Sequence, residues 1–518
     1  MYQFMFAKVL SAAVVGLDGV LVEVETDILN GLPAFTVVGL PDKAVEESKE
    51  RVRSALKNTG ADIPPKRITV NLAPGDLPKE GPSFDLPIAI SILAASGQLT
   101  SNFKKSIFLG ELSLDGSLRH TKGLLPMVLL ASEKKLDSVF IPFDNSLEAS
   151  MLTGIAIYPA KTLKEVFLHL TGEKLIEPLL HTPFEDLEND TLYDFDLKDI
   201  QGQEFVKRAV EVAVSGGHNI LLKGPPGAGK TLLSRTIPSI LPNLTFEEAI
   251  EVTKIYSISG LLSSSTMVKQ RPFRSPHHTT SHIGLIGGSA NPRPGEVSLA
   301  HRGVLFLDEF PEYPRHVLEA MRQPLEDGHV VISRARERVK FPSRFMLVAA
   351  ANPCPCGYYG DKTRMCSCTT LQILKYQKRI SGPLLDRIDI HIDVPAVDVK
   401  KITETGENDS EDSKTVRKRV EKARKRQSAR FAGRKKTTTS SQVVTNSEMS
   451  AKDIKTLLVI DKDAQEILRT AVTNLSLSAR SYHKVIKVAQ TIADLAESDS
   501  IKNEHVLEAL QYRPKTTD

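Results

Sequence analysis

The residues of this chain best suited to chemistry lie between Leu221 and Thr231, in the stretch LLKGPPGAGKT. They fit the spacing G-x-x-x-x-G-K-[ST] of a phosphate-binding loop. In such a loop backbone N–H groups surround an anion, Lys230 reaches the outer phosphates of a nucleotide, and the Thr231 hydroxyl binds Mg²⁺. The residues predicted to bind the nucleotide here are Gly224, Pro225, Pro226, Gly227, Ala228, Gly229, Lys230 and Thr231.

The sequence around this loop supplies the two elements that the motif needs. His218 to Leu222 predicts a short buried strand, and Leu232 to Ile237 predicts the start of a helix. The N-terminus of that helix favours the negative charge of a phosphate. A glycine-rich turn that matches by chance is the alternative, and the flanking strand and helix argue against it.

Two acidic residues follow a second predicted strand. Gly303 to Leu307 is largely apolar and is followed by Asp308 and Glu309, which is typical of a buried parallel strand. Ligands of open α/β sheets bind at the carboxyl ends of the strands. We therefore expect Asp308 to support Mg²⁺ and Glu309 to polarise the attacking water. A strand that ends in solvated acids is the alternative, which the upstream phosphate loop disfavours.

The four cysteines of the chain are clustered in the pattern C-x-C-x₉-C-x-C. Four thiolates can bind Zn²⁺ tetrahedrally, and Gly357 and Gly360 allow the chain to turn between them. The C-x-C spacing is tighter than the usual C-x₂₋₄-C, so a reduced loop without metal is the alternative. The predicted zinc ligands are Cys354, Cys356, Cys366 and Cys368.

Composition indicates a globular, water-soluble protein of several domains. The chain has 518 residues, of which 41% are hydrophobic and 25% are charged, and this length predicts roughly three domains. No apolar run approaches the roughly 18 residues that a membrane span requires, so we expect no membrane partner. The apolar N-terminus lacks a basic segment and continues into a strand pattern, so it does not predict a signal peptide. We therefore expect a cytoplasmic location.

The order of predicted elements divides the chain into four parts. Residues 1–175 alternate strands and helices and predict one α/β domain, with an amphipathic helix from Asp42 to Thr59. Residues 176–199 are an acidic, proline-containing linker. Residues 200–398 contain the phosphate loop and predict an α/β domain with a doubly wound parallel sheet. Residues 414–514 predict helices.

Three N-terminal segments, GLPAFTVVGLPDKAVEESKERVRSAL, ITVNLAPGDLPKEGPSFDLPIAI and GELSLDGSLRHTKGLLPM, resemble one protein family. They look like the N-terminal domain of the YifB/ComM family of magnesium-chelatase-like AAA+ ATPases. The resemblance extends from about residue 8 to about residue 512 and includes NPCPCG, which contains the first two cysteines. It implies an N-terminal α/β domain with the fold of the Lon protease domain, an AAA+ P-loop domain and a C-terminal helical lid.

Lon-type proteases use a Ser-Lys dyad, and only half of that pattern is present. The segment EGPS, which ends at Ser83, resembles the serine half. Aligning KGL on the Gly-Gly-Leu of the lysine half leaves Leu125 to Met127 where the lysine should follow. A serine without an adjacent base is a poor nucleophile, and Lys79 and Lys122 are only distant substitutes. We therefore predict that Ser83 is a turn or cap residue and that this domain is not proteolytic.

The resemblance also implies roles for three residues outside the phosphate loop. Asn352 follows a predicted strand and suits sensor 1, which hydrogen-bonds the γ-phosphate or orients water. Arg387, in the segment LLDR, is the candidate arginine finger that reaches the γ-phosphate of a neighbouring subunit. Arg480 begins a predicted helix and is the candidate sensor 2 placed over the nucleotide. The alternatives are a turn-forming Asn352 and an intrachain pair of Arg387 with Asp386 or Asp389.

Two insertions, residues 272–300 and 328–341, resemble the pore-facing loops of AAA+ helicases. The second insertion predicts a β-hairpin. The net charge of the chain is only +4, but Lys414 to Lys436 contains twelve Lys or Arg and a single acidic residue. Both basic segments are candidates for sequence-independent contacts with DNA phosphates, and a solvated basic face is the alternative. The basic residues of the hairpin are Arg334, Arg336, Arg338 and Lys340.

The family resemblance implies an ATP-driven, ring-forming motor on single-stranded or branched DNA, with Mg²⁺ as a cofactor. It implies a homo-hexamer whose ATP site is shared between subunits. Its best-understood members are branch-migration helicases that aid the integration of DNA during natural transformation. The rival functions are an ATP-dependent Lon-like protease, which the missing lysine disfavours, and a metal-chelatase motor, which the fused N-terminal domain and the basic hairpin disfavour. The predicted catalytic residues are Glu309, Lys230, Asn352, Arg387 and Arg480.

Overall fold

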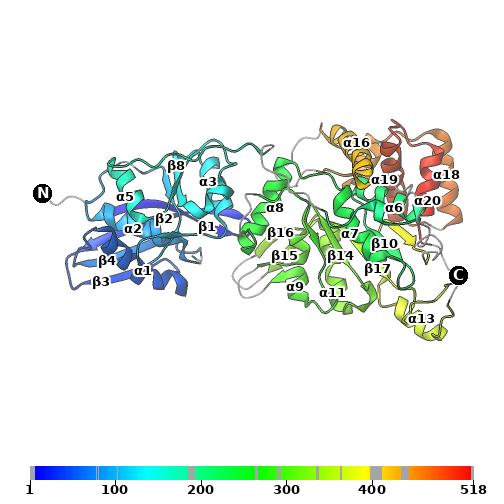
Figure 1. Ribbon diagram of the computed structural model, residues 1–518, viewed down its shortest axis with the longest axis horizontal. Coiled ribbons are helices and arrows are strands. Elements are labelled where there is room, and N and C mark those ends of the chain that lie inside the picture. The colour runs from blue at the N-terminus through cyan, green and yellow to red at the C-terminus, as the bar shows by residue number, and fades with distance from the viewer. Residues whose placement is uncertain are drawn as a thin grey trace. The chain divides into compact units, whose positions relative to one another are not determined.

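The computed structural model describes residues 6–77, 79, 81–101, 103–184, 193–262, 267–288, 293–333, 338–361, 364–396, 411–432, 443–475 and 477–514. The chain forms two compact units (Figure 1). The first unit comprises Met1–Asn189 and Phe246–Val268, and the second comprises Asp190–Thr245 and Lys269–Asp518. Each unit has its own sheet and its own hydrophobic core.

A seven-stranded mixed sheet forms the centre of the first unit, in the order β3-β4-β2-β1-β5-β8-β9. β1 (Phe6–Val15) and β2 (Asp18–Leu29) form an antiparallel hairpin that turns at Gly16. Alternate residues of β2 are buried from Val22 to Ile28, as expected for a strand with one face against a core. The other strands are β3 (Ala34–Val38), β4 (Arg67–Ala73), β5 (Ser106–Phe108), β8 (Ser138–Pro142) and β9 (Ala156–Ala160), and β6 (Glu111–Leu112) pairs separately with β7 (Leu118–Arg119).

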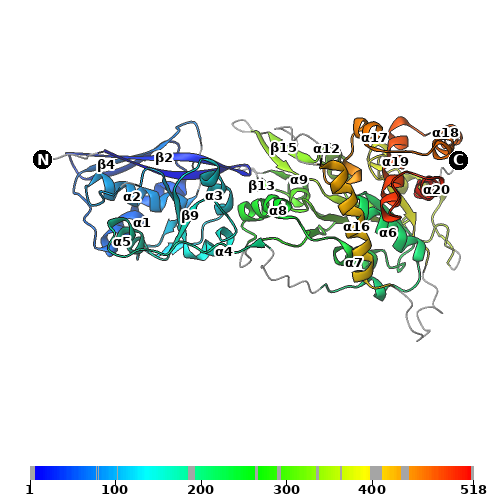
Figure 2. The ribbon, with the colours of Figure 1, turned by 90° about the horizontal axis from the view of Figure 1, so that it is seen from above.

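Helices cover one side of this sheet. In Figure 2, α1, α2, α3 and α5 lie on the same side of β2 and β4. α1 (Lys43–Thr59) begins at Asp42, whose carboxylate accepts the Val45 N–H at 2.8 Å, and it ends at Gly60 in the left-handed conformation. α2 (Asp85–Ala95) is buried on all sides, which explains its continuous apolar sequence. The other helices are α3 (Leu124–Glu133), α4 (Ser146–Ala149), α5 (Leu163–Thr171) and α8 (Phe246–Ser259).

α8 belongs to the first unit, although the chain enters and leaves it from the second. The Ser257 carbonyl accepts the N–H of Gly123 at 3.3 Å, and the Ser257 hydroxyl lies 2.5 Å from the Glu148 carboxylate. The domain predicted at residues 200–398 includes the segment that forms this helix. Its apolar periodicity does not indicate which core it joins. The sequence therefore gives no sign that this helix packs in the first unit. The predicted domain boundaries themselves stay a prediction.

A five-stranded sheet forms the centre of the second unit, in the order β11-β14-β17-β10-β18. All neighbouring strands are parallel. The carboxyl ends of these strands therefore share one edge of the sheet, the carboxyl edge, and the amino ends share the opposite amino edge. The strands are β10 (Ile220–Lys223), β11 (Phe273–Arg274), β14 (Val304–Leu307), β17 (Met346–Ala351) and β18 (Ile390–Asp393).

The helical C-terminal region packs on helices that flank β10. α16 (Ser413–Phe431) contacts α6 (Glu204–Gly216) and α7 (Lys230–Ile240), and α19 (Ala479–Leu495) contacts α6. One hydrophobic core joins the sheet to this region and includes Ile220, Val420 and Tyr512. The other helices of the region are α17 (Ala451–Leu457), α18 (Lys462–Asn474) and α20 (Asn503–Gln511).

Short elements connect the strands of the second unit. Among the described residues, none of the helices is both long and apolar enough to cross a membrane. The connecting elements are α9 (His282–Ile286), β12 (Gly287–Gly288), β13 (Arg293–Pro294), α10 (Glu296–Leu299), α11 (Arg315–Ala320), α12 (Arg322–Asp327), β15 (His329–Ser333), β16 (Arg338–Pro342), α13 (Thr370–Gln377) and α14 (Gly382–Leu385).

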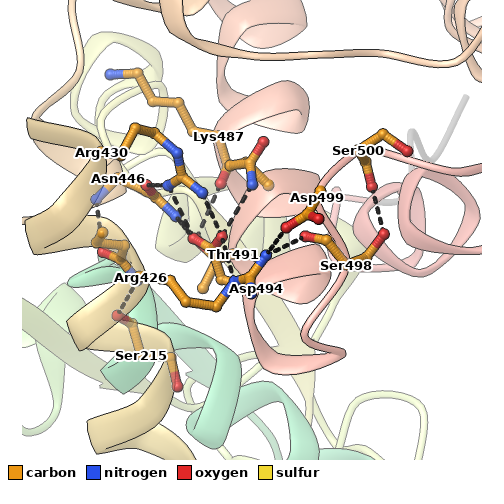
Figure 3. Close-up of polar contacts among 12 residues, drawn as sticks. Ser215, Arg426, Arg430, Asn446, Lys487, Thr491, Asp494, Ser498, Asp499 and Ser500 are labelled. Atoms are coloured by element: carbon orange, nitrogen blue, oxygen red, sulfur yellow. Dashed lines mark hydrogen bonds and ion pairs between the residues drawn. The ribbon is translucent and has the colours of Figure 1, made fainter.

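Several arginines of the basic helix α16 are bound within the second unit. Figure 3 shows Arg430 and Arg426 beside Asp494 of α19 and Asp499, which follows that helix. Arg430 Nη1 donates to the buried Asp494 carboxylate at 3.0 Å, and Arg426 pairs with Asp499 at 2.5 Å. Arg419 donates to a carboxylate on α6 at 2.6 Å. These arginines have acidic partners within the chain, and the contact of the basic run with phosphates stays a prediction.

Candidate functional site

The predicted phosphate loop connects β10 to α7, as the motif requires. Gly227 and Gly229 have φ values of 76° and 79°, which favour glycine over other residues. At Gly224 a Cβ would lie 2.2 Å from the Val394 carbonyl oxygen, so the approach of a second strand also requires glycine. α7 begins at Lys230, immediately after the loop, and its N-terminus faces the space where an anion would bind.

Lys230 points back into the loop. Its ammonium donates hydrogen bonds to the carbonyl oxygens of Gly224 and Pro225 at 2.7 and 2.8 Å and to the Asn352 side-chain oxygen at 3.2 Å. Burial lowers the pKa of Lys230, and the charge of Asp308 opposes that shift. The lysine is thus held at the mouth of the loop, next to the residue predicted as sensor 1.

Thr231 and Asp308 lie together, as expected for a magnesium site. The Thr231 hydroxyl donates to Asp308 Oδ2 at 2.7 Å. Asp308 follows β14 directly, and its other oxygen accepts the N–H of Glu309 at 2.9 Å. A hydroxyl and a carboxylate are oxygen ligands of the kind that Mg²⁺ prefers, and Mg²⁺ commonly uses only one or two protein ligands beside substrate phosphates. The residues present therefore fit this ion.

Glu309 has a backbone conformation that is unusual for its residue type. Its φ is 50°, in the left-handed region, which costs about 1–3 kcal/mol and is found mainly at functional sites. Its carboxylate lies 3.2 Å from Nδ1 of His278, and about half of the Glu309 side chain is exposed. His278 lies in the insertion at residues 272–300, and no sequence motif marks it as a site residue. No spacing rule links that insertion to Glu309, so only the fold reveals the contact.

The carboxyl edge thus gathers residues from three neighbouring strands. Lys230 and Thr231 follow β10, Asp308 follows β14, and Asn352 follows β17. The two hydrogen bonds Lys230–Asn352 and Thr231–Asp308 join them. These predicted site residues are therefore close enough to act on a single nucleotide.

Arg387 lies at the opposite edge of the same sheet. It precedes β18, which pairs with β10 from Ile220↔Ile390 onward, and its carbonyl accepts from Asn219, which precedes β10. The four residues of β10 separate this position from the phosphate loop, a distance of about 13 Å at about 3.3 Å per residue. Arg387 is therefore not positioned to contact a nucleotide in the loop of its own chain.

Arg480 is close to Arg387, since both arginines pair with one carboxylate, and it is not among the described residues that Lys230 contacts. Glu326, near the end of α12, joins the two arginines: one carboxylate oxygen pairs with Arg387 Nη2, and the other lies 3.2 Å from Arg480 Nη2. Burial raises the pKa of Glu326, but the hydrogen bond from Arg387 and the charge of Arg480 lower it overall. The sequence did not indicate Glu326. The alternative pairing of Arg387 with Asp386 or Asp389 is not what the structure shows.

A buried charge network supports this amino edge. Lys484, one turn after Arg480 on α19, donates to the Ile388 carbonyl at 3.0 Å and lies 3.1 Å from Asp389. His218 Nδ1 lies 3.5 Å from the same carboxylate. Burial raises the pKa of Asp389, but Lys484 and His218 hold it well below its usual value. The network attaches the first turns of α19 to the segment that carries Arg387.

The four cysteines converge on one point. Their Sγ atoms all lie within 4.8 Å of one another. The Sγ–Sγ distances are 3.4 Å for Cys354–Cys356, 3.7 Å for Cys354–Cys366 and 3.5 Å for Cys356–Cys366. Sulfur atoms around a tetrahedral Zn²⁺, with bonds of about 2.3 Å, lie about 3.8 Å apart. The distances exceed the roughly 2.05 Å of a disulfide. The donor set therefore fits zinc.

The predicted basic hairpin is present as β15 and β16, which pair antiparallel from His329↔Pro342 to Ser333↔Arg338. Val339 and Phe341 of β16 are buried, whereas Arg338 and Lys340 alternate with them on the exposed face. The tip of the hairpin, with Arg334 and Arg336, lies outside the described residues.

Met127 stands where the alignment expects the Lon lysine, and the structure describes it together with Lys79 and Lys122. Met127 is 2% exposed and belongs to the core of the first unit. Lys79 is fully buried, and its ammonium donates to the Pro74 carbonyl. A Cβ at Gly260 of the segment after α8 would meet the Lys122 side chain, so Lys122 lies against that segment. That Ser83 is not a nucleophile stays a prediction.

Comparisons with known proteins cover nearly the whole chain. Family profiles match residues 196–402 (Magnesium chelatase, subunit ChlI), 24–145 (Subunit ChlI of Mg-chelatase) and 410–513 (Magnesium chelatase, subunit ChlI C-terminal). Competence protein ComM of Haemophilus influenzae is 45% identical over 514 residues, which are 98% of this chain and 97% of that protein. This chain belongs to the YifB/ComM magnesium-chelatase-like family.

Two further relatives of this YifB/ComM family member agree with its fold. The uncharacterized protein YifB of Escherichia coli is 42% identical over 503 residues, 97% of this chain and 96% of that protein. Lon protease of Buchnera aphidicola is 30% identical over 173 residues, 31% of this chain and 22% of that protein. The predicted fold class is confirmed: an α/β chain with a similarity to Lon, a parallel-sheet AAA+ domain and a helical C-terminal region. The AAA+ family supports ATPase activity with ATP and Mg²⁺.

Proposed function

We propose that this protein is the subunit of an ATP-driven AAA+ ring that moves on DNA. The observation that carries the proposal is the division of the candidate residues between two edges of one sheet. Lys230, Thr231 and Asp308 meet at the carboxyl edge, whereas Arg387 and Arg480 meet at the amino edge. A ring in which the amino edge of one subunit faces the carboxyl edge of the next would bring both sets to one nucleotide. We propose a homo-hexamer.

Each residue then has a specific task in hydrolysis. Lys230 binds the outer phosphates, Asn352 contacts the γ-phosphate, and Glu309 polarises the attacking water. Thr231 and Asp308 would hold Mg²⁺, which would supply positive charge to neutralise the phosphate oxygens. Arg387 of the neighbouring subunit stabilises the charge of the transition state, an effect of about 10³–10⁵ in rate for arginine fingers.

The proposed track for the motor is single-stranded or branched DNA. Arg338 and Lys340 line the exposed face of the hairpin, and basic groups of this kind bind phosphates without regard to base sequence. The relative from Haemophilus influenzae is named as a competence protein. We therefore propose a branch-migration helicase that aids the integration of DNA by homologous recombination during natural transformation. Such a motor would work in the cytoplasm.

The proposed cofactors are Mg²⁺ at the ATP site and a structural Zn²⁺ on the cysteine cluster. The two rival functions are weaker. An ATP-dependent Lon-like protease lacks a base beside Ser83, because Met127 is a core residue and Lys79 donates elsewhere. A chelatase-type assembly ATPase gives no role to the exposed basic face of β16.

The decisive experiment measures ATP hydrolysis by the purified protein with and without branched DNA. We expect DNA to stimulate hydrolysis and the protein to move a synthetic Holliday junction in an ATP-dependent manner. The stimulation should fall steeply with added salt, because phosphate contacts release counterions. The same rate with and without DNA, together with an immobile junction, would reject the helicase. Cleavage of casein that is lost in Ser83→Ala would favour the protease instead.

A further inference from the structure

The cysteine cluster lies next to the phosphate loop, and its turn at Gly357 packs against Pro226 of that loop. Cys354 is two residues from Asn352, whose side chain accepts the hydrogen bond from Lys230. Cys354 is fully buried, and its carbonyl accepts the N–H of Gly357 at 3.0 Å. The first two cysteines therefore lie in the turn that follows the strand carrying the predicted sensor.

Gly357 places this turn against the loop itself. Its φ is 87°, and a Cβ built on it would lie 2.5 Å from Cδ and 2.6 Å from Cγ of Pro226. Pro226 is one of the residues of the phosphate loop. The turn and the loop are therefore packed so closely that only a glycine fits between them.

The cluster also ties this turn to a distant part of the chain. Cys366 and Cys368 approach from the other end of the insertion, immediately before α13. Sulfur atoms accept backbone N–H groups within the cluster: Cys368 Sγ accepts from Cys356 at 3.4 Å, and Cys366 Sγ accepts from Cys368 at 3.4 Å. Such bonds stabilise sulfur that carries negative charge, as it does when it ligates a metal. From α13, Gln377 donates to the Pro353 carbonyl at 3.2 Å.

We propose that a tetrathiolate Zn²⁺ site formed by the four cysteines is a clamp on the phosphate loop, so that metal occupancy sets the affinity for nucleotide. The metal joins the two ends of the insertion. In this crosslinked form Gly357 packs against Pro226, and Asn352 is held beside Lys230. Without the metal the insertion loses its main crosslink. Pro226 of the phosphate loop then no longer packs against a rigid turn at Gly357. The inference rests on the proposed ATP site and adds a second ligand that controls it.

The test measures zinc content by mass spectrometry and the affinity of the full chain for a fluorescent ATP analogue. Wild type should contain one zinc per chain. Cys366→Ser with Cys368→Ser should lose the zinc and weaken nucleotide binding by about tenfold, although neither residue touches the loop. Equal affinity with and without zinc would overturn the clamp and leave the motor standing. Failure of zinc-loaded wild type to bind the analogue would instead reject the proposed function.

A matched pair of glycine variants keeps the test independent of cysteine folding. Gly357 and Gly360 have similar φ values, 87° and 80°, but a Cβ at Gly360 would meet nothing within 4 Å. We expect Gly357→Ala to retain zinc and bind the nucleotide several-fold more weakly, whereas Gly360→Ala should retain both zinc and affinity. Equal nucleotide affinity of the two variants would show that contact with Pro226 does not matter and would overturn the proposal.

Discussion

The two edges of the parallel sheet in the second unit differ in how completely they are assembled. At the carboxyl edge Lys230 reaches Asn352, and Thr231 reaches Asp308, through direct hydrogen bonds within the chain. At the amino edge Arg387 and Arg480 share only the half-exposed carboxylate of Glu326. One edge is arranged around the space for phosphates and magnesium. The other holds the mostly buried Arg387 and the more exposed Arg480 on one carboxylate.

Under the proposed function, this difference would give one chain the two halves of a shared site. Residues that follow parallel strands meet at one edge, whatever the length of the connections between them. Residues that precede the same strands are on the far side of the sheet and cannot reach that edge. The arginines therefore act on a neighbour's nucleotide or not on a nucleotide at all, and the following predictions separate these cases.

The largest effect is expected at the carboxyl edge. Lys230→Ala removes the cation that faces the outer phosphates and should reduce ATP hydrolysis to the background of the assay, a loss at least as large as the about 10³–10⁵ of an arginine finger. The exposed Lys462→Ala on α18 is the control and should hydrolyse ATP at the wild-type rate. Colorimetric phosphate release checks both variants. Hydrolysis by Lys230→Ala above a tenth of the wild-type rate would contradict the assignment of the loop.

The next effect concerns the amino edge. Arg387→Ala should lower hydrolysis by about 10³–10⁵, as expected for an arginine finger, without weakening the binding of ATP to an isolated subunit. Mixing this variant with Lys230→Ala should restore measurable hydrolysis, because a ring then contains interfaces with an intact loop from one variant and an intact arginine from the other. A mixture as inactive as its components would mean that the two edges do not share a nucleotide.

A smaller effect is expected from the counter-ion of the arginines. Glu326→Gln removes the charge that Arg387 and Arg480 share, so the arginines should bind a neighbour's phosphate more readily. The ring should assemble at a lower ATP concentration, by at most about fivefold, since exposed ion pairs contribute up to about 1 kcal/mol. Light scattering at increasing ATP concentrations measures this shift. Unchanged assembly with a reduced kcat would show that Glu326 positions the arginines instead.

Glu319→Gln is the matched control for this variant. Glu319 also pairs with an arginine, Arg322, at 2.6 Å, but it lies on α11 and contacts neither Arg387 nor Arg480 through a described ion pair. Its assembly curve should match that of the wild type. A shift as large as that of Glu326→Gln would mean that any loss of negative charge in this region promotes assembly.

The smallest effect is on stability and concerns the buried groups behind the amino edge. Burial lowers the pKa of His218 and lowers that of His391 to about 4. The pKa of a histidine in the unfolded chain is about 6.5. Between these values the unfolded chain binds more protons than the folded chain, so the stability of the second unit falls as the pH falls from about 6.5 to about 4. Asp389, with its lowered pKa, adds a further loss below about pH 4.

Thermal unfolding followed by circular dichroism across this pH range checks the prediction. His391→Gln should flatten part of the slope, because one of the histidines whose pKa is lowered in the folded unit no longer takes up a proton on unfolding. Constant stability of the second unit between pH 7 and pH 4.5 would contradict the burial of neutral histidines. A destabilised but equally pH-dependent His391→Gln would assign the slope to other groups.

Much of the carboxyl edge could be predicted without a structure, because each of its residues has a local sequence signal. Lys230 ends a glycine-rich motif, and Asp308 and Asn352 each follow an apolar run that has the length of a buried strand. His278 and Glu326 have no such signal. Each is linked to the site only by a contact with a residue distant in sequence, Glu309 or Arg387, and no periodicity encodes that contact.

The sequence by itself determined the chemistry of this protein: a phosphate loop, two acids after a strand, a four-cysteine cluster and membership of a family. Short-range geometry controls these features, since strands, turns and helix ends depend on neighbouring residues. Only the tertiary structure decided which residues face one another. It placed Arg480 beside Arg387, joined α8 to the first unit, bound the arginines of α16 internally and set Gly357 against Pro226. The packing of whole elements determines such contacts, because burial of apolar surface selects partners without regard to their separation along the chain.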